Sequence, residues 1–185
     1  MRCSLRLVLP VLILCSSFPA YADNVLIGDF WLIHHQGDMG KNELFIADGE
    51  GTHIINRPGA IKSLGVYQVY EETGGGLTSY DVEIDCAKNR ARINDAQNFN
   101  VLSRWTKLEF SNKWESKADT WLAQSRDFVC RPGERTAMKM RPMGTMSALD
   151  LSDKARDIFP YLSREQYKAA VLKKIDEAFE TMPAK

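Results

Sequence analysis

The stretch YDVEIDC at residues 80–86 decides the fold, because its apolar and acidic residues alternate without a break. Successive side chains of a β-strand point to opposite faces, so the apolar residues of this stretch, Cys86 among them, share one face. Residues 30–35 and 43–47 indicate two more strands, the first with both faces partly covered, and residues 63–72 alternate with a period of two. Short loops separate these segments. Since no helical crossover lies between them, the segments predict an antiparallel meander.

A helical period replaces the strand period further along the chain. Residues 117–129 carry apolar side chains at helical spacing, the segment ends at Cys130, and Pro132-Gly133 then stops the helix. Cys86 and Cys130 are the cysteines left once an export signal is removed, and we expect them to form one disulfide that pins the helix to the sheet. The chain-entropy estimate for closing so long a loop is about 4 kcal/mol. Two free thiols are the alternative.

The first 22 residues have the three parts of an export signal. Arg2 and Arg6 give a basic start, residues 7–15 form an apolar run, and Ala20-Tyr21-Ala22 supplies the small residues that signal peptidase needs. We therefore expect cleavage after Ala22 and secretion across the inner membrane, to the periplasm or to the outer-membrane surface. Lipidation of Cys15 is the alternative, but a bulky leucine precedes this cysteine.

The charge balance gives no support to a polyanionic partner. The chain has 24 basic and 24 acidic residues, and removal of Arg2 and Arg6 leaves 22 basic residues against 24 acidic ones. A near-neutral chain has no general electrostatic attraction to nucleic acid or to a membrane surface. The apolar run of the signal is also too short to serve as a mature membrane span. We expect neither nucleic-acid binding nor a membrane span.

The C-terminal part is predicted to be helical. Ser152 would cap a short helix that ends before Pro160, and Ser163 with Gln166 has the pattern of a capping box that opens a longer helix. The apolar stripe of this longer helix consists of Tyr167, Val171, Ile175, Ala178, Phe179 and Met182. The helix either folds back on its own domain or binds a partner, a second copy included.

These segments together predict an α+β fold. We expect an antiparallel β-sheet of five to six strands, meander-like, with a disulfide-tethered α-helix and a C-terminal helical extension. The chain divides into a signal peptide (1–22), an α+β domain (23–146) and the helical extension (147–185).

Motifs for catalysis or resident metals are weak in this chain. His34 and His35 are strand neighbours that point to opposite faces, so a metal site would need His34 together with His53. The sequence contains no G-x-S-x-G elbow and no H-E-x-x-H motif. We expect no catalytic residues, no cofactor and no enzymatic activity.

The acidic residues of the decisive stretch form a row. Asp81, Glu83 and Asp85 share one strand face, and we interpret this row as a solvated face. Binding of a cation is the competing interpretation.

A methionine cluster follows the second cysteine. Met138, Met140, Met143 and Met146 are separated by two, three and three residues, a spacing that fits neither one strand nor one helix throughout. Spaced thioethers bind Cu(I), so the cluster is a candidate metal site. Packing in the core is the competing explanation, because methionine fills irregular spaces well.

The order of landmarks along the chain is distinctive. A strand with Trp31 is followed by residues 44–48, 66–71 and 80–86, then by basic residues, and finally by residues 121–130 with a tryptophan and a cysteine. This order resembles the surface-adhesin protein E family of Gram-negative bacteria. The resemblance implies an antiparallel sheet curved against a helix, and an envelope protein able to dimerise and to bind host extracellular-matrix or serum proteins.

We therefore expect an exported, non-enzymatic binding protein of the bacterial envelope that binds through a sheet face or edge. Lys88, Arg90 and Arg92 form a basic turn and are candidate contacts for an acidic partner, although a solvated hairpin tip is the simpler role. A host extracellular-matrix protein and a second copy are the candidate partners. Periplasmic Cu(I) binding through the methionine cluster and a structural role in the periplasm are the alternative functions.

Overall fold

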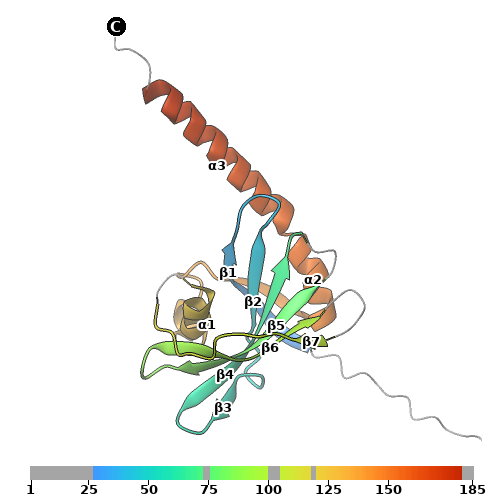
Figure 1. Ribbon diagram of the computed structural model, residues 1–185, viewed down its shortest axis with the longest axis vertical. Coiled ribbons are helices and arrows are strands. Elements are labelled where there is room, and N and C mark those ends of the chain that lie inside the picture. The colour runs from blue at the N-terminus through green and yellow to red at the C-terminus, as the bar shows by residue number, and fades with distance from the viewer. Residues whose placement is uncertain (1–26, 73–75, 100–104, 118–119, 181–185) are drawn as a thin grey trace, which may run out of the picture.

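The described part of the chain forms one antiparallel sheet with helices on both faces (Figure 1). The computed structural model describes residues 27–72, 76–99, 105–117 and 120–180. The strands are β1 (Ile27–Gln36), β2 (Glu43–Asp48), β3 (Ile55–Arg57), β4 (Ile61–Tyr70), β5 (Leu77–Asp85), β6 (Arg90–Phe99), β7 (Trp105–Lys107) and β8 (Arg141–Ser147). The helices are α1 (Trp121–Cys130), η1 (Pro132–Glu134), α2 (Ala148–Arg156) and α3 (Phe159–Glu180).

The sheet is largely a meander, and β8, a strand from late in the chain, is added at its edge beside β1. The strand order is β7-β6-β5-β4-β2-β1-β8, and β3 pairs with the first part of β4. The α+β class, the antiparallel sheet and the meander are confirmed. The predicted count of five to six strands was too low, because the described residues form eight. Two of these strands, β3 and β7, have only three residues each, too few to show a period.

Strand β8 was missed because a bulge interrupts its alternation. Phe30 pairs with Gly144 and Trp31 pairs with Pro142, so Met143 is an extra residue in β8. Gly144 has a φ of +98°, a conformation that glycine adopts without strain. The bulge lets Met143 and Met146, three residues apart, border the same core, which a regular strand would not allow.

Alternating side chains of the sheet build two apolar cores. On β2, Phe45 and Ala47 join the core under α1, while Leu44 and Ile46 join the core under α2. The β5 pattern behaves as predicted at Val82 and Ile84, which are fully buried, but not at Cys86, which lies in the turn after the strand and is exposed. The first core contains Ile33, Phe45, Ala47, Leu64, Val66, Val82, Ile84, Ala91, Leu122, Phe128, Val129 and Met140. The second contains Phe30, Leu32, Leu44, Ile46, Tyr67, Val69, Leu77, Leu151, Ala155 and Phe159.

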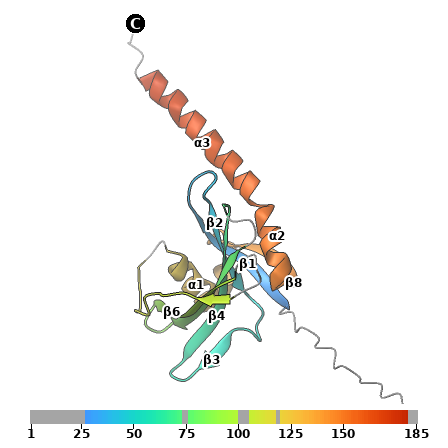
Figure 2. The ribbon, with the colours of Figure 1, turned by 45° about the vertical axis from the view of Figure 1, so that its right-hand side comes forward.

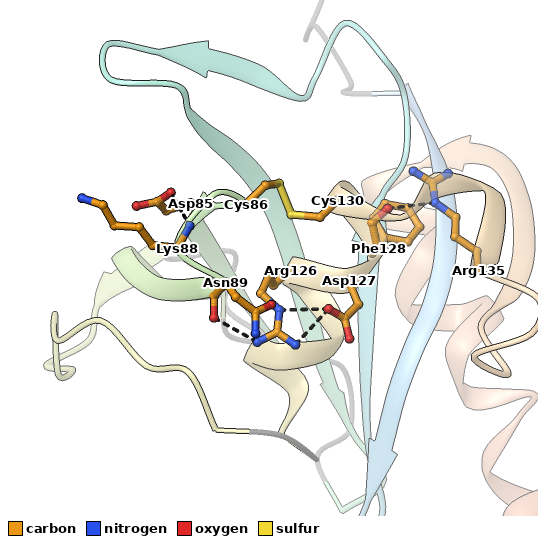
Figure 3. The surroundings of a disulfide bond; sticks show 9 residues. All are labelled: Asp85, Cys86, Lys88, Asn89, Arg126, Asp127, Phe128, Cys130 and Arg135. Carbon is orange, nitrogen blue, oxygen red and sulfur yellow. Dashed lines mark hydrogen bonds and ion pairs between the residues drawn. A yellow bond between two sulfur atoms is a disulfide. The ribbon is translucent and has the colours of Figure 1, made fainter.

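The predicted disulfide is confirmed. Cys86 follows β5 and Cys130 ends α1, and their bond closes a sequence separation of 44 residues. Figure 3 shows the bond beside a second tie, in which Arg126 donates from Nη1 to the backbone oxygen of Asn89 at 3.3 Å. The helix itself starts where Thr120 accepts a hydrogen bond from the amide of Ala123. The predicted start at residue 117 was too early, because α1 begins at Trp121. Ala118 lies outside the described residues.

The predicted caps of the C-terminal helices were wrong. Ser147, not Ser152, caps α2, and its Oγ accepts from the amide of Asp150 at 3.1 Å. Ser163 lies inside α3, which already begins at Phe159, so Ser163 and Gln166 form no capping box. Polar residues of this kind also serve tertiary contacts, and local spacing alone does not distinguish the two uses.

Candidate functional site

The base of α3, residues 159–166, is bound to the tip of the β1–β2 hairpin and to the end of β4. Ser163 donates to Oε1 of Glu71 at 3.0 Å. The side-chain amide of Gln166 donates to Oδ1 of Asn42 at 2.7 Å and to the backbone oxygen of Gly37 at 3.0 Å. These bonds fix the direction in which the helix leaves the sheet.

Glu71 is the centre of this anchor. The backbone amide of Asn42 donates to its Oε2 at 3.0 Å and the side-chain amide of Asn42 donates at 2.7 Å. Burial alone would raise the pKa of Glu71, but the hydrogen bonds from Asn42 and Ser163 outweigh burial and hold the pKa below its usual value. The carboxylate is therefore ionised at neutral pH.

The distal half of α3, residues 167–180, leaves the body of the protein. Both views show the helix extending away from the sheet (Figures 1 and 2), and every residue of this segment is exposed. The alternative in which the helix folds back on its own domain is thus wrong for the distal half. Within the described ranges, no helix is both long and apolar enough to cross a membrane.

The distal half carries an apolar stripe with no cover in the described chain. Tyr167 is 61% exposed and Phe179 is 65% exposed, and Val171 and Ile175 lie between them at intervals of four. Residues four apart on a helix lie on one face, so the four side chains form one stripe. The predicted last member of the stripe, Met182, lies outside the described residues. Exposed apolar surface of this extent is typical of an interaction site.

A polar hollow of about 440 Å³ occupies the half of the sheet that α2 leaves open. Its floor is formed by small residues of β4 and β5, including Ser63, Gly65 and Ser79. A Cβ at Gly65 would meet only Tyr67, at 4.0 Å, so the space above this position is empty. Trp105 stands at the rim and is 53% exposed.

The charged groups in and beside this hollow are paired with one another. Arg57 donates to Asp81 at 2.6 Å and to Glu83 at 3.2 Å, and Arg92 pairs with the other oxygen of Glu83 at 2.6 Å. Lys107 lies 3.5 Å from Oδ1 of Asp95. A network that is neutralised internally leaves little charge for a ligand, so we do not assign binding to the hollow.

The interpretation of the acidic row as a solvated face was wrong. Glu83 is 7% exposed and Asp85 is 6% exposed, and Asp85 is paired with Arg90 at 3.1 Å. Buried carboxylates need partners, and arginines from β3 and β6 supply them. Arg90 and Arg92 alternate along the next strand in the sequence. Only the pairing of β5 with β6 shows that they lie opposite Asp85 and Glu83.

The histidines do not form a metal site. His53 contacts Asp48 at 2.7 Å beside the hollow, whereas His34 packs against Phe45 on the other side of the sheet. Burial, followed by the charge of His35, lowers the pKa of His34. The described residues contain no group of three or more His, Cys, Asp or Glu side chains that would hold a metal ion.

The methionine cluster is divided between the two cores. Met140 is buried in the first core and Met138 packs against it, while Met143 and Met146 pack against the second core on the opposite face of the sheet. The structure therefore does not bring the four thioethers together.

The basic turn is only partly available to a partner. Arg90 and Arg92 are bound to Asp85 and Glu83, and both guanidinium groups lie within 4.6 Å of the Trp114 ring centre. Lys88 differs, because its backbone amide donates to Asp85 while its ammonium group points away from the body (Figure 3).

Comparison of the chain with protein-family models, with curated proteins and with solved structures finds no match. The resemblance to surface-adhesin protein E therefore remains a hypothesis from the sequence, and the functional argument below depends on the chain's own residues.

Proposed function

We propose that this chain is an exported, non-enzymatic binding protein of the bacterial envelope, and that the distal half of α3 engages a protein partner. The observation that carries the proposal is the uncovered stripe of Tyr167, Val171, Ile175 and Phe179 on a helix whose base is hydrogen-bonded to the sheet and whose distal half extends away from it. A helix of this kind docks its apolar face into a groove of a partner.

Intrahelical forces give the distal half little stability of its own. Isolated helices of this length are marginal in water. Asp176, Glu177 and Glu180 lie near the C-terminus of α3, where the helix dipole disfavours negative charge. Lys173 precedes Glu177 by four residues at 3.8 Å, which is the less favourable order for such a pair. A partner that covers the stripe would supply the missing stabilisation.

The partner class is a protein rather than a membrane or a nucleic acid. The distal half contains three lysines and three acidic residues, so it has no net attraction to an anionic surface. Host extracellular-matrix and serum proteins are the partners that the resemblance to surface-adhesin protein E suggests, and a second copy is the other candidate. The Cys86–Cys130 bond supports an oxidising location such as the envelope.

Location is tested first, by cell fractionation and mass analysis of the purified protein. We expect an envelope protein that starts at Asp23 and whose mass is two hydrogens below that of the dithiol form. A cytoplasmic protein that keeps residues 1–22 would contradict the proposal.

Partner binding is tested with a pair of matched variants. Val171→Asp with Ile175→Asp places two charges in the stripe, while Ala169→Asp with Lys173→Gln makes the same change in net charge on the opposite face of the same helix. Surface plasmon resonance over immobilised fibronectin, type IV collagen and serum albumin would measure host binding, and light scattering would measure self-association. We expect at least one of these interactions in the parent protein, a loss of about tenfold or more in the stripe variant, and little change in the control. Equal binding by parent and stripe variant would contradict the proposal.

A further inference from the structure

A second hollow, here called the edge pocket, lies where the pairing between β1 and β8 stops. It has a volume of about 310 Å³ and lies between the end of β1, the loop before β8 and the start of α3. Strand β8 pairs with β1 only as far as Leu32 and Arg141, so residues 33–36 lie beyond the paired stretch. The pocket belongs to neither the polar hollow nor the stripe of α3.

The base of the edge pocket is apolar. Leu32 and Ile33 are buried members of the two cores, and they line the pocket from opposite faces of β1. Ile158 and Leu162, from the junction of α2 and α3, pack against the second core and complete the base. Such a base accepts hydrocarbon and disfavours a fully polar ligand.

The rim of the edge pocket is basic and has no acidic counterpart. Lys139, Arg141, His34 and His35 line it, and the lining contains no Asp or Glu. In the described part of the chain, neither Lys139 nor Arg141 forms an ion pair. This is the reverse of the polar hollow, whose Arg57 is shared by two carboxylates. Asp157 lines the neighbouring hollow together with Arg141, but the two side chains are not paired.

The loop that presents Lys139 is fixed before any ligand arrives. The backbone amides of Met138, Lys139 and Met140 donate to carbonyl oxygens of the preceding turn at 3.0 Å each. Lys139 itself has a φ of +63°, which few residues other than glycine adopt. Backbone held in such a conformation is common where a structure positions functional groups, and a fixed loop lowers the entropy cost of binding.

One polar atom at the edge pocket lacks a partner. Oε1 of Gln124 is buried and accepts no hydrogen bond from the described residues. An unsatisfied buried amide costs free energy that a bound molecule or water would recover.

We propose that the edge pocket binds an amphipathic small molecule, with its anionic carboxylate or phosphate head between Lys139 and Arg141 and its hydrocarbon part on Leu32, Ile33 and Leu162. The binding function of α3 neither requires this site nor is required by it. Phosphate and carboxylate groups are the anions that guanidinium groups recognise best, and an apolar base adds affinity that a free anion lacks.

Octyl phosphate is a suitable probe, used below the concentration at which it forms micelles. Titration of the ¹⁵N-labelled mature chain should give saturable shifts in the amides of residues 32–35 and 138–141. Octanol, which lacks the charge, and inorganic phosphate, which lacks the tail, should each bind at least about tenfold more weakly. No saturable shift with octyl phosphate, or equal affinity for inorganic phosphate, would overturn the proposal.

Charge variants test the two cations separately. Arg141→Gln and Lys139→Gln should each weaken octyl phosphate binding by up to about fivefold, the range of a solvent-exposed ion pair, and the double variant should weaken it further. Both residues are exposed, so we expect these variants to fold normally. Lys113→Gln removes an exposed lysine of the loop after β7 and should change nothing. Parent-like affinity in the double variant would overturn the proposal.

Vesicles distinguish the source of the ligand. Cosedimentation with phosphatidylglycerol vesicles that depends on Lys139 and Arg141 would support the proposal with a membrane lipid as ligand. Binding of octyl phosphate without cosedimentation would support it with a soluble amphiphile as ligand.

Discussion

Two phenylalanines at opposite ends of α3 show how differently its halves are used. Phe159 is 4% exposed and belongs to the core under α2, whereas Phe179 is 65% exposed. Hydrogen bonds tie Ser163 and Gln166 to the sheet. In contrast, Lys173 and Glu177 of the distal half form a salt bridge within the helix.

This contrast separates residues that hold the fold from residues that are available for a partner. The base of α3 is a structural element of the domain, although the sequence suggested a boundary before it at residue 147. The distal half adds apolar surface that the domain does not use. Substitutions in the base of α3 should therefore change stability, and substitutions in the distal half should change binding alone.

The largest expected effect concerns the disulfide, which stabilises the body but not the distal half. Replacing Cys86 and Cys130 by alanine should lower the free energy of unfolding by about 4 kcal/mol, because the unfolded chain is no longer constrained by a long loop. Urea unfolding of the mature chain measures this loss. A loss below about 1 kcal/mol would mean that the bond does not constrain the unfolded chain as proposed.

The next largest loss of stability is expected for Phe159→Ala, with Phe179→Ala as its matched control. Phe159→Ala should cost about 3 kcal/mol or more, since it leaves a cavity in the second core. Phe179→Ala should change the free energy of unfolding by less than about 0.5 kcal/mol, as for other surface substitutions. Equal losses in the two variants, measured by urea unfolding, would show that the halves of α3 do not differ.

A smaller effect is expected at the hydrogen bond between Ser163 and Glu71. Ser163→Ala removes the hydrogen bond to Glu71 and should cost about 1 kcal/mol. Hydrogen exchange should become faster at the base of α3 and stay unchanged in the strands. Ser116→Ala, at an exposed serine of the loop before α1, is the control and should have no effect.

The smallest effect is a pH dependence from Glu71. Because the folded-state pKa of Glu71 lies below its usual value of 4.5, its contribution to stability is complete above that value. The contribution should decline as the pH falls through the lower, folded-state pKa. The unfolding free energy of Glu71→Gln, measured between pH 6 and pH 3, should therefore fall less steeply than that of the parent. Parallel curves would contradict the role given to this carboxylate.

The sequence predicted those parts of the fold that depend on local periodicity. Val82 and Ile84 lie on the buried face of β5 because alternation is a direct consequence of strand geometry. The disulfide followed from having two cysteines in an export context. Strand β8 was not predicted, because Met143 is the extra residue of a bulge and breaks the period.

The surfaces were harder to predict, because they depend on residues far apart in sequence. Ser163 and Gln166 have the spacing of a capping box, yet their partners Glu71 and Asn42 are about a hundred positions away. The basic rim of the edge pocket joins β1 with the loop before β8. The apolar stripe of α3 was visible in the sequence, but its lack of cover was not.

Truncation after Gln166 is the most direct test of the claim that the distal half is a binding element and not part of the fold. The account predicts that the shortened mature chain unfolds in urea with the free energy of the full chain, within about 0.5 kcal/mol. A loss of more than about 2 kcal/mol would show that residues 167–180 pack on the domain and would contradict the account.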